Sequence, residues 1–235
     1  EEGGLTVRIL QELFAIEASL AEYVYVFDYT SKDVRAMQLL ADLADAVVVW
    51  GGDSAVKAVR EMAGLGTRII EWGHKMSFAY VSGPVGDVAL EGIAHNICKT
   101  NQLLCSSCQG IFIDTESMDE VYEFCGRFLP VLSRVCREYP RADGLGVAAQ
   151  CGLRLYNESI EAVFNGARVY KGDDCSMIAY QDSRLTTSIM FRNCWVRRLP
   201  RAGIVGTLRP YKNYLQTIGL ACEEGRVSEL AELFW

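Results

Sequence analysis

Short apolar runs alternate with segments of helical period along the first hundred residues, and this alternation constrains the fold more than any other feature. The runs are rich in β-branched and aromatic residues and occupy residues 23–28, 45–52, 67–73 and 77–83. The helical segments occupy residues 5–23, 31–44, 53–64 and 85–100. Continuous apolar strands separated by helices are typical of βαβ units whose parallel sheet is covered on both faces. The sequence therefore predicts an α/β fold with a mostly parallel sheet.

The same alternation continues after residue 100. We expect further strands at residues 110–115, 167–171, 175–180 and 187–191, and further helices at residues 117–139 and 147–164. The stretch PRADGLG (140–146) is the clearest loop because proline and glycine interrupt the helical pattern there. The tail from Tyr211 onward is expected to be mostly helical.

Length and composition limit the number of domains. The chain has 235 residues and is 50% hydrophobic, which is enough for one large domain or for two smaller lobes that share a core. It begins EEGGLTVRIL, without methionine, and enters a helical pattern almost at once. We therefore expect it to be part of a longer protein.

Charge and cysteine content exclude several classes of protein. The net charge is −7, so nucleic acid and anionic membranes are poor candidates for partners. The basic stretch WVRRLPR (195–201) is better explained as a strand with a solvated face than as an anion site. No membrane-spanning run or signal peptide is visible. The nine cysteines are odd in number and scattered, which predicts reduced thiols in a cytoplasmic protein.

A strand–glycine–helix junction at residues 47–59 (VVVWGGDSAVKAV) is the first candidate site. Gly51 and Gly52 allow a tight turn and a close approach of the backbone to a ligand. The helix that follows offers free N–H groups, with Asp53 and Ser54 in its first turn. This geometry suits a phosphate or the nicotinamide edge of a cofactor, although the carboxylate of Asp53 would compete with a phosphate. A plain connection between strand and helix is the alternative.

Glu71, at the end of the apolar run RIIEWG, is the second candidate. Desolvation at the end of a buried strand tends to raise the pKa of a carboxyl towards the range useful to a general base. An ion pair between Glu71 and Lys75 explains the same position equally well.

The third candidate is the cysteine segment NQLLCSSCQG (101–110). A structural zinc site at Cys105 and Cys108 would need a second pair of ligands, and the chain has no second CxxC and only two histidines. A thioredoxin-like pair would open a helix, whereas this segment runs into a predicted strand. A single nucleophile, Cys105, fits better because the serines and Gly110 around it leave room for a carbonyl substrate. A buried structural cysteine remains the common alternative.

Taken in order, these three stretches resemble motifs of the aldehyde dehydrogenase superfamily. They resemble its strand–glycine–helix element, its E-L-G-G-K strand pair and its N-x-G-Q-x-C nucleophile segment. The spacing agrees, with about 19 residues from Gly52 to Glu71 and 34 from Glu71 to Cys105. Within the superfamily, WGGDSAV, NQLLCSSCQGIFID and YLQTIGL are most similar to the LuxC-type acyl-CoA reductases. The resemblance covers nearly the whole chain, but only the later part of such a protein.

The resemblance implies an enzyme that reduces an acyl-CoA or another acyl thioester to an aldehyde, with NADPH or NADH as cofactor. It implies that Cys105 is the nucleophile, that Glu71 is the acid or base, and that no metal is needed. The residues beside the nicotinamide would be Gly51, Gly52, Asp53 and Ser54.

The resemblance also implies an architecture and partners. Residues 1–75 would be the closing part of a Rossmann-type dinucleotide-binding lobe, and residues 76–235 would be the catalytic lobe. Self-association into a homo-oligomer and a possible acyl-transferring partner protein are expected on analogy alone.

The chain departs from the superfamily pattern in three places. The Q-x-C spacing becomes Q-x-x-C from Gln102 to Cys105, and His74 replaces the second glycine of E-L-G-G-K. The stretch FRNCWVRRLP (191–200) lacks the glutamate that holds the nicotinamide ribose in relatives, so the choice between NADH and NADPH stays open. Two alternatives remain, namely an aldehyde dehydrogenase acting in the oxidative direction, with Glu71 activating water, and a catalytically incomplete domain.

Overall fold

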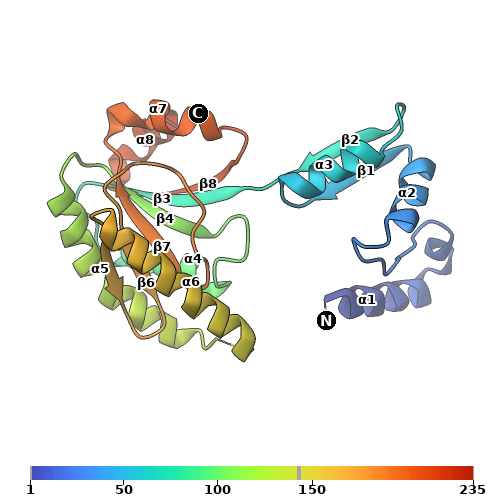
Figure 1. Ribbon diagram of the computed structural model, residues 1–235, viewed down its shortest axis with the longest axis horizontal. Coiled ribbons are helices and arrows are strands. Elements are labelled where there is room, and N and C mark those ends of the chain that lie inside the picture. Colours follow the sequence, from blue (N-terminus) through green and yellow to red (C-terminus); the bar gives the residue numbers. More distant parts are fainter. Residues whose placement is uncertain (1, 142–143, 235) are drawn as a thin grey trace. The chain divides into compact units, whose positions relative to one another are not determined.

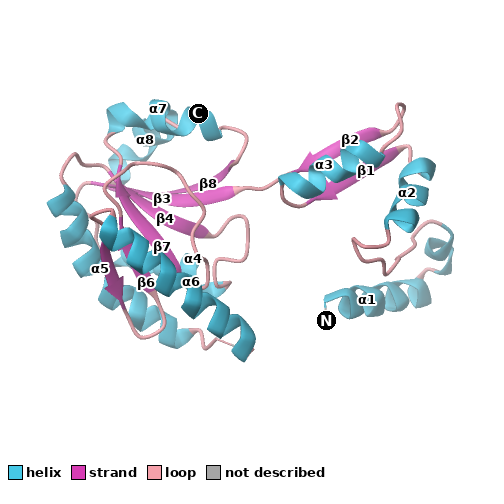
Figure 2. Cartoon of the chain, viewed as in Figure 1, coloured by secondary structure: helices cyan, strands magenta, loops and turns pink. Residues whose placement is uncertain are grey.

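Figure 1 shows the computed structural model, which describes residues 2–141 and 144–234. The chain divides into two compact units, Glu1–Gly73 and His74–Trp235, each with its own sheet. In both units the strands, magenta in Figure 2, alternate with helices along the chain. The α/β class predicted from the sequence is thereby confirmed.

The first unit contains a βαβ motif. Strand β1 (Ala46–Trp50) leads through α3 (Asp53–Met62) to β2 (Arg68–Trp72). The two strands pair in parallel, with Val49 opposite Glu71. This motif is preceded by α1 (Glu2–Ile16), η1 (Ala18–Glu22) and α2 (Val34–Leu43).

The strand predicted at residues 23–28 is wrong. The segment is irregular, and the aromatic rings of Tyr25, Phe27 and Tyr29 stack on one another at centroid distances of 6.4 and 5.5 Å while remaining exposed. Aromatic and β-branched residues favour a strand only where a neighbouring strand and a core accept them. No strand among the described residues pairs with this segment, so its composition alone does not make it a strand.

The second unit holds a six-stranded sheet in the order β5-β6-β7-β4-β3-β8. Neighbouring strands pair in parallel except β5 and β6, which are antiparallel. The predicted, mostly parallel sheet is thus confirmed. The strands are β3 (Met76–Ser82), β4 (Cys108–Ile113), β5 (Arg168–Lys171), β6 (Ser176–Ala179), β7 (Asn193–Arg198) and β8 (Leu215–Cys222).

Helices cover both faces of this sheet, which explains why its central strands lack polar alternation. Along β3, Ala79 belongs to the core on one face while Phe78 and Tyr80 belong to the core on the other. The first face is covered by α4 (Asp87–Lys99) and α5 (Met118–Glu138), and the second by α6 (Leu145–Phe164), α7 (Ile204–Leu208) and α8 (Val227–Glu232). Short 3₁₀ turns lie at η2 (Arg201–Gly203), η3 (Arg209–Tyr211) and η4 (Glu224–Arg226).

Three expectations for the later part of the chain are corrected. The strand expected at residues 187–191 is a loop, and β7 begins after it at Asn193. The basic stretch from Trp195 does form a strand, but β7 lies between β6 and β4 and is buried rather than solvated. The tail expected to be helical contains β8, which pairs with β3 at the sheet edge.

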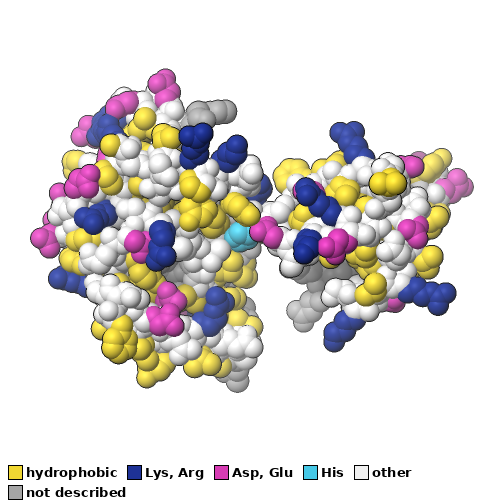
Figure 3. Space-filling model, turned by 45° about the horizontal axis from the view of Figure 1, so that its top comes forward, with side chains coloured by type: hydrophobic (Ala, Val, Ile, Leu, Met, Phe, Trp, Pro, Cys, Tyr) yellow, Lys and Arg dark blue, Asp and Glu magenta, His cyan; other side chains and the backbone are white. Residues whose placement is uncertain are grey.

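The surface of the two units carries both signs of charge. On the face drawn in Figure 3, basic and acidic side chains are interspersed without a continuous basic patch. Within residues 2–141 and 144–234, no helix has the length and apolar character needed to cross a membrane.

Gly110 on β4 is a position where the packing requires glycine. A Cβ there would lie 2.0 Å from the ring of Trp195, its partner on β7. We expect Gly110→Ala to lower the free energy of unfolding of the second unit by about 2 kcal/mol, because overpacking displaces neighbouring side chains or backbone. Urea unfolding measures the loss.

The control for this prediction is Gly126→Ala in α5. A Cβ at Gly126 meets nothing within 4 Å. Alanine is the better helix former, so this variant should be up to about 1 kcal/mol more stable than the parent. Equal stability of the two alanine variants would contradict the close packing of β4 on Trp195.

Candidate active site

The candidate nucleophile, Cys105, lies on the loop that joins α4 to β4. Its side chain is exposed, whereas seven of the other cysteines are buried and Cys222 is half-buried. Because β3, β4, β7 and β8 run in parallel, their N-terminal residues lie at the same end of the sheet. The Cys105 loop lies at that end. The structure therefore places its one exposed cysteine thiol where the strands begin.

Ser77 on β3 ties this loop to the sheet. Its hydroxyl donates a hydrogen bond to the carbonyl of Cys105 (2.6 Å) and accepts one from the backbone N–H of Thr217 on β8 (3.1 Å). The cysteine backbone is thus connected through one side chain to two strands. The sequence offered no signal for this role of Ser77.

Asn101 and Gln102 begin the loop in the left-handed region, with φ of 51° and 62°. The Gln102 side chain is fully buried. Its amide donates to the carbonyl of Cys108 (2.9 Å), and its carbonyl oxygen accepts from the backbone N–H of Asn193 on β7 (3.1 Å). Gln102 therefore fastens the loop to the first residues of β4 and β7.

Arg192 is a buried residue of the site that the sequence did not reveal. It lies in a second left-handed segment, Met190–Arg192, and is 1% exposed. Its Nε donates to the side-chain oxygen of Asn101 (2.8 Å), and its Nη1 pairs with the carboxylate of Asp174 (2.7 Å). A buried arginine near a loop residue has no local pattern, so only the tertiary structure identifies it.

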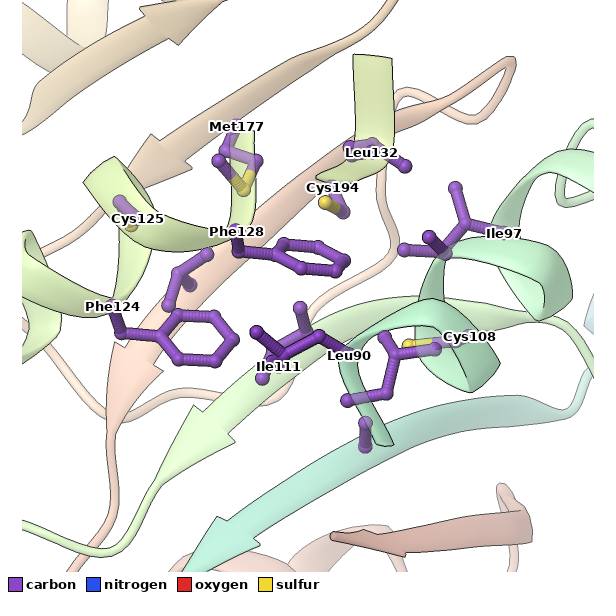
Figure 4. Close-up of a cluster of buried hydrophobic side chains, with 14 of the residues drawn as sticks. Leu90, Ile97, Cys108, Ile111, Phe124, Cys125, Phe128, Leu132, Met177 and Cys194 are labelled. Carbon is purple, nitrogen blue, oxygen red and sulfur yellow. The ribbon is translucent and has the colours of Figure 1, made fainter. Parts of the chain in front are cut away.

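Cys108 is a structural cysteine. Figure 4 shows it in the cluster that includes Leu90, Ile97 and Ile111. Its thiol donates to the carbonyl of Gly110 (3.2 Å), and burial raises its pKa to about 12. A thiol with such a pKa is almost wholly protonated at neutral pH and makes a poor nucleophile.

Neither the zinc nor the paired-cysteine interpretation gains support. Cys105 and Cys108 are both free thiols, one exposed and one buried. In the part of the chain that the structure describes, no group of three or more histidine, cysteine or acidic side chains could hold a metal ion.

Glu71 has a different environment from the one expected. It lies on β2 of the first unit, and the Arg60 guanidinium on α3 forms a two-bond ion pair with it, in which Nη2 lies 2.7 Å from Oε2. This hydrogen bonding holds the pKa of Glu71 below its usual value, so the expected upward shift is wrong. Lys75 is not its partner and instead donates to the carbonyl of Asn213 (2.6 Å).

The predicted strand–glycine–helix junction is present in the first unit. Helix α3 begins at Asp53 directly after its N-cap residue, Gly52, which has no side chain with which to cap the helix. A Cβ on Gly51 would lie 2.9 Å from that of Ala55, whereas one on Gly52 would meet nothing within 4 Å. The backbone at Gly52 is therefore open to close approach, which fits the edge of a nicotinamide cofactor. Ser54 is exposed in the first turn.

A groove of 320 Å³ runs beside the nucleophile loop, between α4 and β8 and over β3. At the end near the loop its lining is polar, with Ser77, Asn96, Ser106 and Thr217. The rest of the lining is apolar and includes several small residues. It is made of Phe78, Ala79, Ala89, Gly92, Ile93, Cys108, Gly219, Leu220 and Ala221.

The mostly parallel sheet, with its exposed cysteine on the loop before a central strand, has the fold of solved aldehyde dehydrogenases. The NADP-dependent glyceraldehyde-3-phosphate dehydrogenase of Bacillus halodurans, solved with NADP, matches 87% of the chain and 46% of its own with a TM-score of 0.63 at 12% identity. PnpE from Pseudomonas sp. WBC-3 matches 85% of the chain and 45% of its own with a TM-score of 0.59 at 16% identity. These likenesses establish the fold.

Within that fold, the chain belongs to the LuxC acyl-CoA reductase family, whose model matches residues 1–234. It is 27% identical over 156 residues to long-chain acyl-protein thioester reductase 2 of Photobacterium leiognathi, a match that covers 64% of the chain and 30% of that protein. It is 34% identical over 94 residues to the long-chain acyl-protein thioester reductase of Photobacterium phosphoreum, covering 40% of the chain and 19% of that protein. These matches span less than a third of either relative's length.

Proposed function

We propose that the protein reduces an acyl thioester, such as an acyl-CoA, to an aldehyde through an acyl-enzyme on Cys105. The observation that carries this proposal is the exposure of Cys105 at the end of the sheet where the parallel strands begin. Every other cysteine is buried or half-buried. Membership of the LuxC family supports the substrate class, as do the names of the similar acyl-protein thioester reductases.

In the proposed reaction, the Cys105 thiolate attacks the carbonyl carbon of the thioester. A new C–S bond forms, the C–S bond to the leaving thiol breaks, and the leaving thiolate takes up a proton. Among the described residues, none accepts a hydrogen bond from the N–H of Cys105, so this donor is free to face the developing oxyanion. Ser77 holds the adjoining carbonyl, which orients the peptide on the other side of the cysteine.

A nicotinamide cofactor, NADPH or NADH, would supply the hydride that reduces the acyl group to the aldehyde level. Gly51, Gly52, Asp53 and Ser54 would hold its nicotinamide end against the start of α3. Cleavage of the remaining C–S bond then releases the aldehyde and returns the thiolate. We assign residues up to Gly73 to the closing part of the dinucleotide lobe, and the sheet unit from His74 to the catalytic lobe.

Glu71 is proposed to stay ionised at neutral pH, because its ion pair with Arg60 favours the carboxylate. It is therefore better suited to accept a proton than to donate one. This role, a homo-oligomeric assembly, an acyl-transferring partner protein and a cytoplasmic location all stay predictions.

The acyl chain of the substrate is proposed to lie in the groove between α4 and β8. Its polar end adjoins the nucleophile loop at Ser106, and its small apolar lining along Gly92 and Gly219 leaves a path for methylene groups. This order of polar and apolar residues matches a thioester carbonyl followed by a hydrocarbon chain.

We expect Gly92→Phe to shift the chain-length preference of Cys105 acylation. The added ring fills the groove, and excluding two methylenes at about 0.8 kcal/mol each lowers the rate with long acyl-CoA about tenfold. Acylation by a four-carbon acyl-CoA should be unchanged. Intact-mass measurement of the acyl-enzyme over time gives both rates.

Gly126→Phe is the matched control for this prediction. Like Gly92, it is an exposed helical glycine with nothing within 4 Å of an added Cβ, but it lies on α5 and does not line the groove. It should leave both rates unchanged. A similar loss in both variants, or no loss with Gly92→Phe, would place the acyl chain elsewhere.

The proposed function itself is tested with unmodified protein, long-chain acyl-CoA and no cofactor. A mass increase of one acyl group, located on the peptide that contains Cys105, is the expected result. Addition of NADPH or NADH should then release aldehyde. Aldehyde-dependent reduction of NAD without any acyl-CoA-dependent oxidation of NADPH or NADH would instead favour the oxidative alternative.

A further inference from the structure

Two backbone segments in the left-handed region contact each other where the Cys105 loop begins. Among the described residues, the non-glycine residues with positive φ are Asn101, Gln102 and Met190–Arg192, and none lies elsewhere. Each such residue costs on the order of 1 kcal/mol or more, and such strain persists only where the surroundings enforce it. Five residues with positive φ in two contacting segments therefore indicate that this backbone conformation has a function here.

The two segments are joined by three consecutive donors. The backbone N–H of Phe191 donates to the carbonyl of Asn101 (2.9 Å), and Arg192 Nε donates to its side-chain oxygen (2.8 Å). The backbone N–H of Asn193 then donates to the side-chain oxygen of Gln102 (3.1 Å). These bonds hold the start of the Cys105 loop against the start of β7.

Arg192 is itself immobilised from the other side. Its guanidinium pairs with Asp174 (2.7 Å) and donates to the carbonyls of Cys136 (3.2 Å) and Tyr139 at the C-terminal end of α5. Helix C-termini leave carbonyls without intrahelical partners, so a buried cation is well placed there. Arg192 is therefore a fixed point that connects α5, the loop before β6 and the nucleophile loop.

We propose that Arg192, acting through Asn101, is a positioning residue for Cys105. Asn101 lies four residues before the thiol, and the intervening Leu103 and Leu104 are exposed. The loop is thus held by Asn101 and Gln102 at one end and by the bond from Ser77 at the cysteine itself. Removing the Arg192–Asn101 contact loosens one end and lets the thiol leave the orientation needed for attack. This inference rests on the proposed role of Cys105 as nucleophile.

The test compares Asn101→Gly with Asn101→Asp. Glycine keeps the left-handed backbone but removes the acceptor, whereas aspartate keeps an acceptor for Arg192. We expect Asn101→Gly to lower the maximal rate of Cys105 acylation by long-chain acyl-CoA about 10- to 100-fold, since small misplacements of reacting groups have effects of this size. The half-saturating concentration should be unchanged, and Asn101→Asp should restore the rate to within about threefold of the parent.

Two further readouts separate positioning from a general loss of structure. Alkylation of Cys105 by iodoacetamide needs no particular loop orientation and should change less than about twofold. Hydrogen exchange of the backbone amides in residues 103–107 should be faster in Asn101→Gly and near the parent rate in Asn101→Asp. Arg192→Lys, which keeps a charge near Asp174 but loses the planar fork, should behave like Asn101→Gly.

Equal acylation rates in the glycine and aspartate variants would overturn the positioning role. So would unchanged hydrogen exchange of residues 103–107 in Asn101→Gly. If the parent protein is not acylated at Cys105, the proposed function fails, while the hydrogen-exchange comparison still decides whether Arg192 orders the loop.

Discussion

Cys105→Ala is expected to abolish both acylation of the protein by acyl-CoA and formation of aldehyde. Removing the atom that carries the covalent intermediate eliminates the reaction path, so the loss should be about 10³-fold or more. The Cys105 side chain is exposed, so the variant should fold and unfold like the parent. Intact-mass analysis with acyl-CoA, and cofactor oxidation with aldehyde detection, measure the two losses separately.

Cys108→Ala is the control because it removes the neighbouring thiol of the same CxxC pattern. It should keep most of the acylation rate, and its cost should appear as stability, at about 1 kcal/mol for a small side chain lost from the core. The buried thiol bonded to Gly110 takes no part in the proposed chemistry. Equal loss of acylation in both variants would mean that the two cysteines act together.

The fold was predictable from the sequence where local pattern and tertiary environment agree. The run at residues 45–52 and the helix from Asp53 form the βαβ motif because both the composition and the neighbouring strand favour it. Residues 23–28 have similar composition but no partner strand among the described residues, and β8 lies in a stretch whose flanks read as helical. In both segments the presence or absence of a partner strand decided the structure. A local sequence pattern carries no information about that partner.

The candidate site was predictable only in part, for a related reason. Cys105 stood out because its spacing from Glu71 and Gly52 resembles a known motif. The ion pair of Glu71 depends on Arg60, 11 residues away on a helix, and it reversed the expected direction of the pKa shift. Arg192 donates to Asn101, which lies 91 positions earlier in the chain. Arg192 lies in a left-handed turn that contains no glycine, and no sequence pattern predicts such a turn.

Asp174→Asn should lower the free energy of unfolding of the second unit more than the other substitutions of partly exposed residues proposed here. It removes the carboxylate that pairs with Arg192 at 2.7 Å, and that arginine side chain is 1% exposed. The buried guanidinium of Arg192 is then left with neutral acceptors, namely the Asn101 side chain and two carbonyls of α5 and its C-cap. Breaking a buried ion pair costs about 3–5 kcal/mol. Because the Asp174 side chain is 41% exposed, we expect a loss at the lower end of this range, about 3 kcal/mol. Urea unfolding followed by circular dichroism measures it.

The preceding residue supplies the matched control. Asp173 pairs with Arg137 at 3.2 Å, but both side chains are mostly exposed, so Asp173→Asn should change the free energy of unfolding by less than about 0.5 kcal/mol. Adding salt should weaken any effect at Asp173 and leave most of the effect at Asp174, because buried pairs are screened less. Similar losses at the two positions would mean that Arg192 is not held by its counter-charge. On the side away from the Cys105 loop, Arg192 would then be held by the carbonyls of Cys136 and Tyr139 alone.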